Sequence, residues 1–466
     1  MNELTIPSGS RSELRELIKN QLQILLEQKN YEGAKALLLP VRSVDIAEAI
    51  EMLPPSLQLI AFRLLKKAEA IEVYEYLDTT VQQFLVEQFK DQEEIEIIEH
   101  ISPDERAKLF DELPPKIVRK LVSQLSPEER QATALLLGYT EKTAGRIMTP
   151  EYIALKKDLT IIQAQEKIKS YIDKSELSYY IYVTDNQRKL VGIISLKDLI
   201  VTPFDQSLET IMNSDIVYAY TDTNQEEVAK LIQRYDLIAL PIVDKEENLV
   251  GIVTIDDVLD ILEEETTEDI YRMGAVQSEG DNYFDNNFFQ IVKKRIPWLL
   301  ILLLTNSATV FIMSNYEAVL EEVVALAFFT PLLIDAGGNV GAQSSTVVIR
   351  GLSTDELKNK TPMQVLIKEL ISGGLLGIIL GILVIVGVLL FMSFFTSIDP
   401  GVGITVGLSL FAITMIAAVT GAGLPFMFNA MGFDPALMSA PLITTVVDIL
   451  GILIYFNVAK IFLLNN

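Results

Sequence analysis

The chain has 466 residues, 63 acidic and 38 basic side chains, and a net charge of −25. It contains no cysteine and a single histidine, His100, which excludes disulfides, thiolate metal sites and histidine-rich metal sites. The acidic balance also lacks the basic footprint of a nucleic-acid-binding protein, so no nucleic-acid partner is expected. The length predicts several domains, and the first twenty residues hold no apolar stretch typical of a signal peptide.

Residues 1–140 are predicted to form an acidic, all-helical domain. Apolar residues recur at helical spacing, and the segment 47–65 resembles the segment 107–125. Each segment consists of a helix, a Leu-Pro-Pro break and a second helix, which is typical of stacked helical hairpins. Ser102 and Ser126 each precede a proline and acidic residues, a pattern that predicts helix N-caps.

Residues 148–265 contain a second repeat. LVGIISLKDLI at 190–200 matches LVGIVTIDDVL at 249–259, and Met148-Thr-Pro matches Met212-Asn-Ser. Each unit is predicted to run strand, helix, strand, strand, helix, which resembles a tandem pair of cystathionine-β-synthase (CBS) domains. We assign the first to residues 141–206 and the second to residues 207–262. Both domains should have α/β folds.

CBS pairs commonly bind adenine nucleotides, and a recurring turn in this chain supplies suitable chemistry. A hydroxyl and a carboxylate recur three residues apart, as Ser195 with Asp198 and as Thr254 with Asp257. The carboxylate can accept hydrogen bonds from ribose, and the helix N-terminus favours phosphate. The alternative is plain helix capping by the hydroxyl.

An acidic segment, residues 256–269, follows the second CBS domain. It contains eight acidic residues in fourteen and no basic residue. Several of these acids share one helix face, where like charges repel, and a bound cation would relieve that repulsion. The alternative is a solvated acidic helix. We assign residues 263–295 to an acidic connecting helix between the soluble and membrane parts.

Residues 296–466 are predicted to form an α-helical membrane domain. Five apolar stretches are long enough to cross a bilayer, at about 297–315, 323–349, 366–395, 402–429 and 436–462. The 350–368 loop carries four basic residues, whereas the 316–322 loop carries three acids and no base. The positive-inside rule then places the N-terminus in the cytoplasm and the C-terminus outside.

Asp448 lies in the middle of the fifth stretch, where a charge costs at least about 2.5 kcal/mol to insert. Thr444 shares its helix face and Thr445 flanks it. Pro441 could free carbonyls near residues 437–440, so the face would offer only oxygen ligands. The alternative is a structural acid paired with another helix. In the second stretch, Asp335, Asn339 and Gln343 form a polar stripe, and nearby glycines allow close helix approach.

The order of these parts resembles the MgtE family of magnesium channels and transporters. PLLIDAGGNVGAQSSTVVIRG at 331–351 and PLITTVVDILG at 441–451 are the most specific motifs. The resemblance implies a homodimer in the plasma membrane, with Asp448 as the pore carboxylate and a backbone carbonyl of Thr444 nearby. It also implies that the connecting helix is a plug that closes the pore when Mg²⁺ is plentiful.

The resemblance further implies regulatory Mg²⁺ ligands and a nucleotide site. The positions that fit regulatory Mg²⁺ are Asp104, Glu226, Asp236, Asp257, Asp260, Glu265, Glu268, Asp269 and Asp434. Four residues after Asp104, where the family can carry a second acid, this chain has Lys108. The positions that fit adenine and ribose of ATP, as a regulator, are Tyr180, Lys197 and Asp198.

Magnesium chemistry agrees with these residues, because Mg²⁺ prefers oxygen ligands and sheds its water reluctantly. No phosphate loop, nucleophile elbow or paired histidine is visible, so we expect a channel and not an enzyme. Two alternatives stay open: a transporter of another divalent cation such as Co²⁺ or Mn²⁺, and a membrane-anchored nucleotide or metal sensor without a pore.

Overall fold

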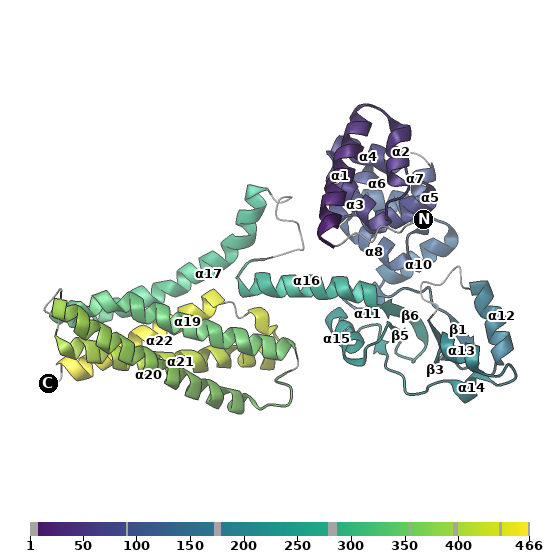
Figure 1. Cartoon of the computed structure of the whole chain (residues 1–466). Coiled ribbons are helices and arrows are strands. Elements are labelled where there is room, and N and C mark those ends of the chain that lie inside the picture. Colours follow the sequence, from purple (N-terminus) through teal and green to yellow (C-terminus); the bar gives the residue numbers. More distant parts are fainter. Residues whose placement is uncertain are drawn as a thin grey trace. The chain divides into compact units, whose positions relative to one another are not determined.

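The computed structural model describes residues 8–89, 92–171, 179–277, 287–354, 356–394, 399–437 and 440–464. The chain divides into two units, Met1–Leu262 and Glu263–Asn466. The first contains the helical and CBS domains and the second contains the long apolar helices (Figure 1). The predicted fold class, an all-helical domain followed by two α/β domains and a helical membrane domain, is confirmed.

The N-terminal domain consists of ten helices within the described residues: α1 (Ser8–Glu27), α2 (Tyr31–Leu38), α3 (Ser43–Glu51), α4 (Pro55–Arg63), α5 (Lys67–Glu75), α6 (Thr79–Gln88), α7 (Gln92–His100), α8 (Pro103–Glu112), α9 (Pro115–Gln124) and α10 (Pro127–Leu137). Both Leu-Pro-Pro breaks fall between helices, as predicted, because the second proline begins α4 and α9, where it costs no backbone hydrogen bond. Ser126 caps α10, whereas Ser102 makes no side-chain cap.

Each CBS domain contains a three-stranded sheet with one parallel and one antiparallel pairing. The first sheet contains β1 (Ala154–Lys156), β2 (Tyr180–Thr184) and β3 (Leu190–Ser195), with helices α12 (Ile161–Tyr171) and α13 (Leu196–Val201). The second contains β4 (Ala219–Tyr220), β5 (Ala239–Val243) and β6 (Leu249–Thr254), with helices α15 (Gln225–Tyr235) and α16 (Ile255–Met273). Two short helices, α11 (Ala144–Ile147) and α14 (Leu208–Ile211), precede the two repeats.

The segments before the two repeats are exchanged between the sheets. Thr149 bridges Ile252 of β6, and Asn213 bridges Ile193 of β3. Gly251 makes room for this crossing, since an added Cβ would lie 2.6 Å from the sulfur of Met148. Each matched Met motif therefore completes the other repeat's sheet, which interlocks the two CBS domains.

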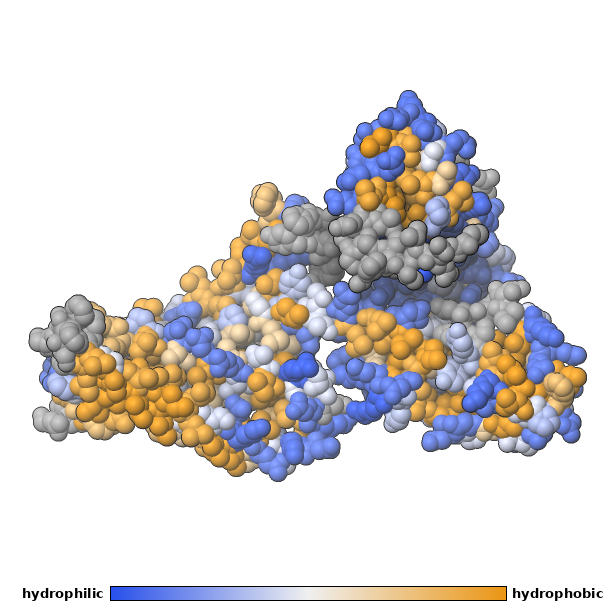
Figure 2. Space-filling view, viewed as in Figure 1, coloured by the Kyte–Doolittle hydropathy of each residue, from blue (hydrophilic) through white to orange (hydrophobic). Residues whose placement is uncertain are grey.

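Within the described residues, the second unit contains five helices that are long and apolar enough to cross a membrane, as predicted. They are α17 (Phe288–Asn315), α19 (Ala325–Ser353), α20 (Pro362–Phe394), α21 (Pro400–Ala430) and α22 (Ala440–Ala459); a short helix α18 (Glu317–Glu322) and a 3-10 turn (Pro435–Leu437) lie between them, and a π-helical turn (Lys460–Leu464) follows α22. Helices α19 to α22 pack side by side (Figure 1). Apolar side chains cover much of their outer surface (Figure 2), as suits a surface that faces lipid.

Helix α16 begins inside the range predicted for the second CBS domain. It runs from Ile255 to Met273, and α17 begins at Phe288, so the described part of the predicted connecting segment is not one continuous helix. Residues 278–286 of that segment lie outside the described residues. Residues 255–261 remain part of the CBS core because Val258 and Ile261 are buried there.

Candidate functional site

Asp448 lies on α22, at the point where this helix packs against Gly338 of α19. A Cβ added to Gly338 of α19 would lie 3.6 Å from Asp448 Oδ1 and 3.3 Å from Thr444 Cγ2. Among the described residues, no basic side chain forms an ion pair with Asp448. The structural alternative, an acid neutralised by a base on another helix, therefore finds no support in the described part of the chain.

Thr444 and Thr445 both donate their hydroxyls to the carbonyl oxygen of Pro441, at 2.9 Å each. Pro441 lies in the first turn of α22, where its missing N–H costs no intrahelical bond. Pro441 therefore does not interrupt a described helix, and two of the carbonyls expected to be free, those of residues 438–439, lie outside the described residues. The hydroxyl protons of Thr444 and Thr445 are engaged in hydrogen bonds within α22. An ion on this face of α22 would therefore contact the lone pairs of the hydroxyl oxygens and the carboxylate of Asp448.

The polar stripe of α19 is exposed within a single chain. Asp335, Asn339 and Gln343 are all exposed, and Asn339 Nδ2 donates to Asp335 Oδ2 at 3.2 Å. The opposite face of α19 is buried against α21 and α22, where Gly341 and Gly421 bring two backbones into close contact. A polar stripe at membrane depth is costly against lipid, so this face must meet protein or water.

Among the acids of α16, Asp257 has a clearly raised pKa. Its pKa is raised to about 6, mainly by burial and less by the nearby acids Asp256 and Glu105, although a hydrogen bond from Thr254 lowers it. The Thr254 hydroxyl donates to Asp257 Oδ2, so the repeated hydroxyl–carboxylate turn forms as predicted. Asp257 is half-buried and Asp260 is exposed one turn later.

Sequence reasoning did not single out Glu75 and Glu105 of the N-terminal domain. The pKa of Glu75 is raised to about 7, mainly by burial and less by Glu105 and Glu72. A backbone hydrogen bond from Ser102 opposes this rise. Glu105 thus acts electrostatically on both Glu75 and Asp257. The signal in the sequence is its position beside Asp104, which is buried in the first turn of α8.

The other predicted acids lie in varied surroundings. Glu226 forms an ion pair with Lys230 at 2.7 Å, and Asp236 is exposed at the end of α15 in a left-handed conformation. Glu265 and Asp269 are half-buried on α16. Glu268 and Asp434 both contact Arg272, a base that the sequence analysis did not consider. Within the described residues, no three acidic or histidine side chains are grouped closely enough to hold a metal ion.

The predicted nucleotide-contacting residues lie at one end of the first CBS sheet, where β2 begins and β3 ends. Tyr180 begins β2, while Lys197 and Asp198 are exposed in the first turn of α13. Ser195 accepts from the backbone N–H of Asp198 at 3.1 Å and donates to Asp198 Oδ2 at 2.6 Å. The capping alternative is therefore realised, and Lys197 and Asp198 remain exposed.

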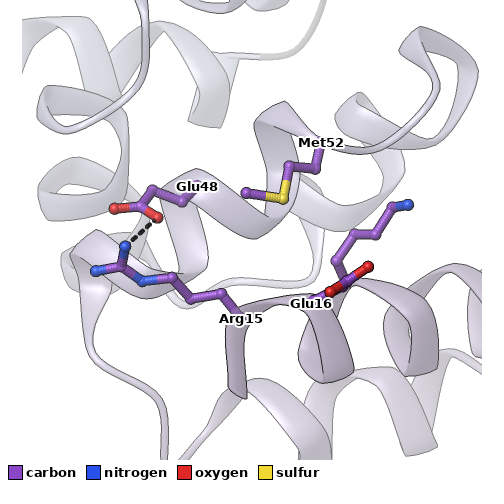
Figure 3. A pocket seen from close by; sticks show the side chains of 5 residues that line it. Arg15, Glu16, Glu48 and Met52 are labelled. Atoms are coloured by element: carbon purple, nitrogen blue, oxygen red, sulfur yellow. Dashed lines mark ion pairs between the residues drawn. The ribbon is translucent and has the colours of Figure 1, made fainter. Parts of the chain in front are cut away.

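A separate cavity of about 470 Å³ lies on the N-terminal domain (Figure 3). It is lined by Arg15, Glu16, Lys19, Glu48 and Met52. Arg15 pairs with Glu48 at 2.7 Å and with Asp45 at 2.8 Å, which largely neutralises the charge of this wall. None of the predicted site residues lines this cavity.

Comparison with known proteins identifies the parts of the chain. Residues 330–458 match the profile of a divalent cation transporter family, MgtE; residues 41–142 match the MgtE intracellular N domain; and residues 144–203 and 208–264 match CBS domains. The magnesium transporter MgtE of Thermus thermophilus is 38% identical over 72% of this chain and 73% of its own length. The Bacillus subtilis transporter of the same name is 32% identical over 72% of each chain.

A solved structure resembles about half of the chain. The cytosolic domain of the Mg²⁺ channel MgtE, crystallised in complex with ATP, is 34% identical, with a TM-score of 0.50. The match covers 52% of this chain and 99% of that domain.

Proposed function

The chain belongs to the MgtE family of divalent cation transporters, and we propose that it is a magnesium-selective channel closed by cytoplasmic Mg²⁺. The observation that carries the proposal is Asp448, a carboxylate on a membrane-spanning helix without an ion-pair partner in the described residues. Such acids normally line ion pathways. The relatives named above are magnesium transporters, and oxygen-only chemistry around Asp448 suits the same ion.

The pore forms between two copies of the chain. The exposed stripe of Asp335, Asn339 and Gln343 needs a polar or aqueous neighbour, and a second copy supplies one. Asp448 of α22 lies beside Gly338, which directly precedes Asn339 of this stripe. A homodimer with α19 and α22 near its axis would hold two Asp448 carboxylates around a hydrated Mg²⁺, with the Thr444 backbone close by. The alternative of a single-chain pore leaves the stripe facing lipid.

Cytoplasmic Mg²⁺ closes the channel by neutralising acids on and around α16. Two unit charges about 6 Å apart repel by about 3 kcal/mol at an effective dielectric of about 20. Burial, and to a smaller extent such neighbours, raises the pKa of Asp257, so a bound cation would favour the charged form of a carboxylate that the fold disfavours. The ligands we propose are Asp104, Glu226, Asp236, Asp257, Asp260, Glu265, Glu268, Asp269 and Asp434. Several weak sites together supply the preference for the closed state.

An adenine nucleotide is the second regulatory ligand. Lys197 and Asp198 suit phosphate and ribose, and Tyr180 can stack on adenine. The cytosolic domain of a related channel has been crystallised with ATP. The soluble unit lies in the cytoplasm, because the basic loop at 350–368 marks the cytoplasmic side, and five spans place the C-terminus outside.

Purified protein in liposomes tests the pore. We expect Mg²⁺ influx in the wild type and its loss in Asp448→Asn, which keeps the shape of the side chain and removes its charge. Asp399→Asn is the matched control, because Asp399 caps α21 through Gly401 N–H and asparagine can do the same. Wild-type influx in Asp448→Asn, with dimers intact on size-exclusion chromatography, would show that this carboxylate does not serve the pore.

The same liposomes discriminate the alternatives. A transporter of another divalent cation would carry Co²⁺ or Mn²⁺ in preference to Mg²⁺, and a sensor without a pore would give no flux for any ion. A magnesium channel should give Mg²⁺ flux that Ca²⁺ does not replace.

A further inference from the structure

The end of α16 is attached to the turn between α21 and α22 by a guanidinium. Resting on the proposed function, we propose that Arg272 is a built-in counter-ion that holds this end of α16 against the pore helices without Mg²⁺, and that it competes with Mg²⁺ for Asp434 and Glu268. Both acids are among the Mg²⁺ ligands proposed above, so the competition is direct.

Arg272 bridges two carboxylates through different nitrogens. Its Nη2 contacts Glu268 Oε1, one turn earlier on α16, and its Nη1 contacts Asp434 Oδ2 in the turn after α21. The side chains of Arg272, Glu268 and Asp434 are 34%, 22% and 33% exposed, respectively, so all three are partly withdrawn from water. Asp434 Oδ1 accepts from Ala436 N–H at 2.8 Å. Both oxygens of Asp434 therefore have donors from the protein itself.

An apolar contact accompanies the ionic one. Met273, the last residue of α16, packs against a buried cluster that includes Val340 of α19 and Ile443 and Val447 of α22. Val447 directly precedes Asp448, and Ile443 directly precedes Thr444. The end of α16 therefore packs on a buried cluster whose α22 members directly precede the proposed pore residues.

The charges decide what each cation can do at this contact. Without Arg272, Glu268 and Asp434 would lose the cation that they share. Arg272 reaches both acids with one planar guanidinium, which offers a separate nitrogen to each carboxylate. Mg²⁺ must displace it and also lose part of its own water, which it does reluctantly. Arg272 thus permits docking at zero Mg²⁺ and raises the Mg²⁺ concentration needed to occupy these two acids.

The cysteine-free chain allows a test that does not depend on transport. In a Met273→Cys background, the rate of maleimide labelling at position 273 reports whether the end of α16 is docked. Full-length protein in detergent with EDTA should label slowly. Adding Arg272→Gln should raise the rate about fivefold, the effect expected for a partly exposed ion pair. Asp434→Asn should do the same, and the double variant should label no faster than either alone.

Matched variants separate the ion pair from general effects. Lys293→Gln removes an exposed positive charge from α17 and should leave the rate unchanged. Arg272→Lys keeps the charge and should fall between the wild type and the glutamine variant. Adding Mg²⁺ to Arg272→Gln should restore slow labelling, because Glu268 and Asp434 are then available to the ion.

Equal labelling rates for wild type and Arg272→Gln in EDTA would overturn the proposal. So would a double variant whose effect is the sum of the two single changes, since the two residues would then act independently. Fast labelling of Arg272→Gln that added Mg²⁺ does not slow would overturn the competition. Failure of the pore assignment would appear separately, as unchanged flux in Asp448→Asn, with the labelling result intact.

Discussion

Replacing Asp257 by asparagine tests the idea that acidic crowding around α16 makes the fold responsive to Mg²⁺. Asparagine keeps an oxygen that can accept from Thr254, and it cannot ionise. The wild-type carboxylate ionises beside Asp256 and Glu105 in a half-buried position, and this is the cost that the variant removes.

The sign follows from the direction of the pKa change. The pKa of Asp257 rises from 3.8 to about 6 on folding, so the folded state holds the proton more tightly than the unfolded chain. This contribution to stability is complete below about pH 4 and is lost as the pH rises through about 6. The loss is at most about 3 kcal/mol, at 1.36 kcal/mol for each pKa unit. Above pH 6 without Mg²⁺, Asp257→Asn should therefore be more stable than the wild type.

Hydrogen exchange in the full-length protein measures this locally. Amides at residues 255–262 should lose protection in the wild type between about pH 5 and about pH 7.5 in EDTA, after correction for the intrinsic pH dependence of exchange. The asparagine variant should keep its protection, and Mg²⁺ at about 1 mM should restore the wild type. Asp205→Asn, an exposed change elsewhere in the CBS pair, is the control. Identical pH dependence in the wild type and Asp257→Asn would refute the reasoning.

Two further predictions concern the regulatory ligands. Asp198→Ala should weaken ATP binding to the full chain at least tenfold, about 1.4 kcal/mol, because a ribose-facing carboxylate is lost; calorimetry that shows no heat in the wild type with an adenine nucleotide at millimolar concentration would remove the nucleotide from the mechanism. Neutralising four acids together should leave the channel open at Mg²⁺ concentrations that close the wild type; the four are Asp257, Asp260, Glu265 and Glu268. Patch recordings in which this variant closes at the wild-type Mg²⁺ concentration would contradict Mg²⁺ gating.

Local patterns were enough to predict the three kinds of domain. The Leu-Pro-Pro breaks, the repeated hydroxyl–carboxylate turns and the five apolar stretches are all encoded over a few neighbouring residues. Asp448 could be selected from the sequence because a lone acid at the centre of an apolar stretch has few structural reasons to be there. The glycines of α19 were likewise informative, since Gly338 and Gly341 do lie at close helix contacts.

Tertiary structure decided which distant segments meet. The sequence repeat assigns Met148 to the first CBS domain and Met212 to the second, yet each packs on the other domain's sheet, because strand pairing joins residues far apart in the chain. The same holds for charge. From the sequence, Asp434 and Glu268 are acids awaiting a cation, whereas the fold brings Arg272 to both of them, across 162 residues in one case. The sequence determines which charged side chains lie along each helix, and only packing determines which of these charges share a site.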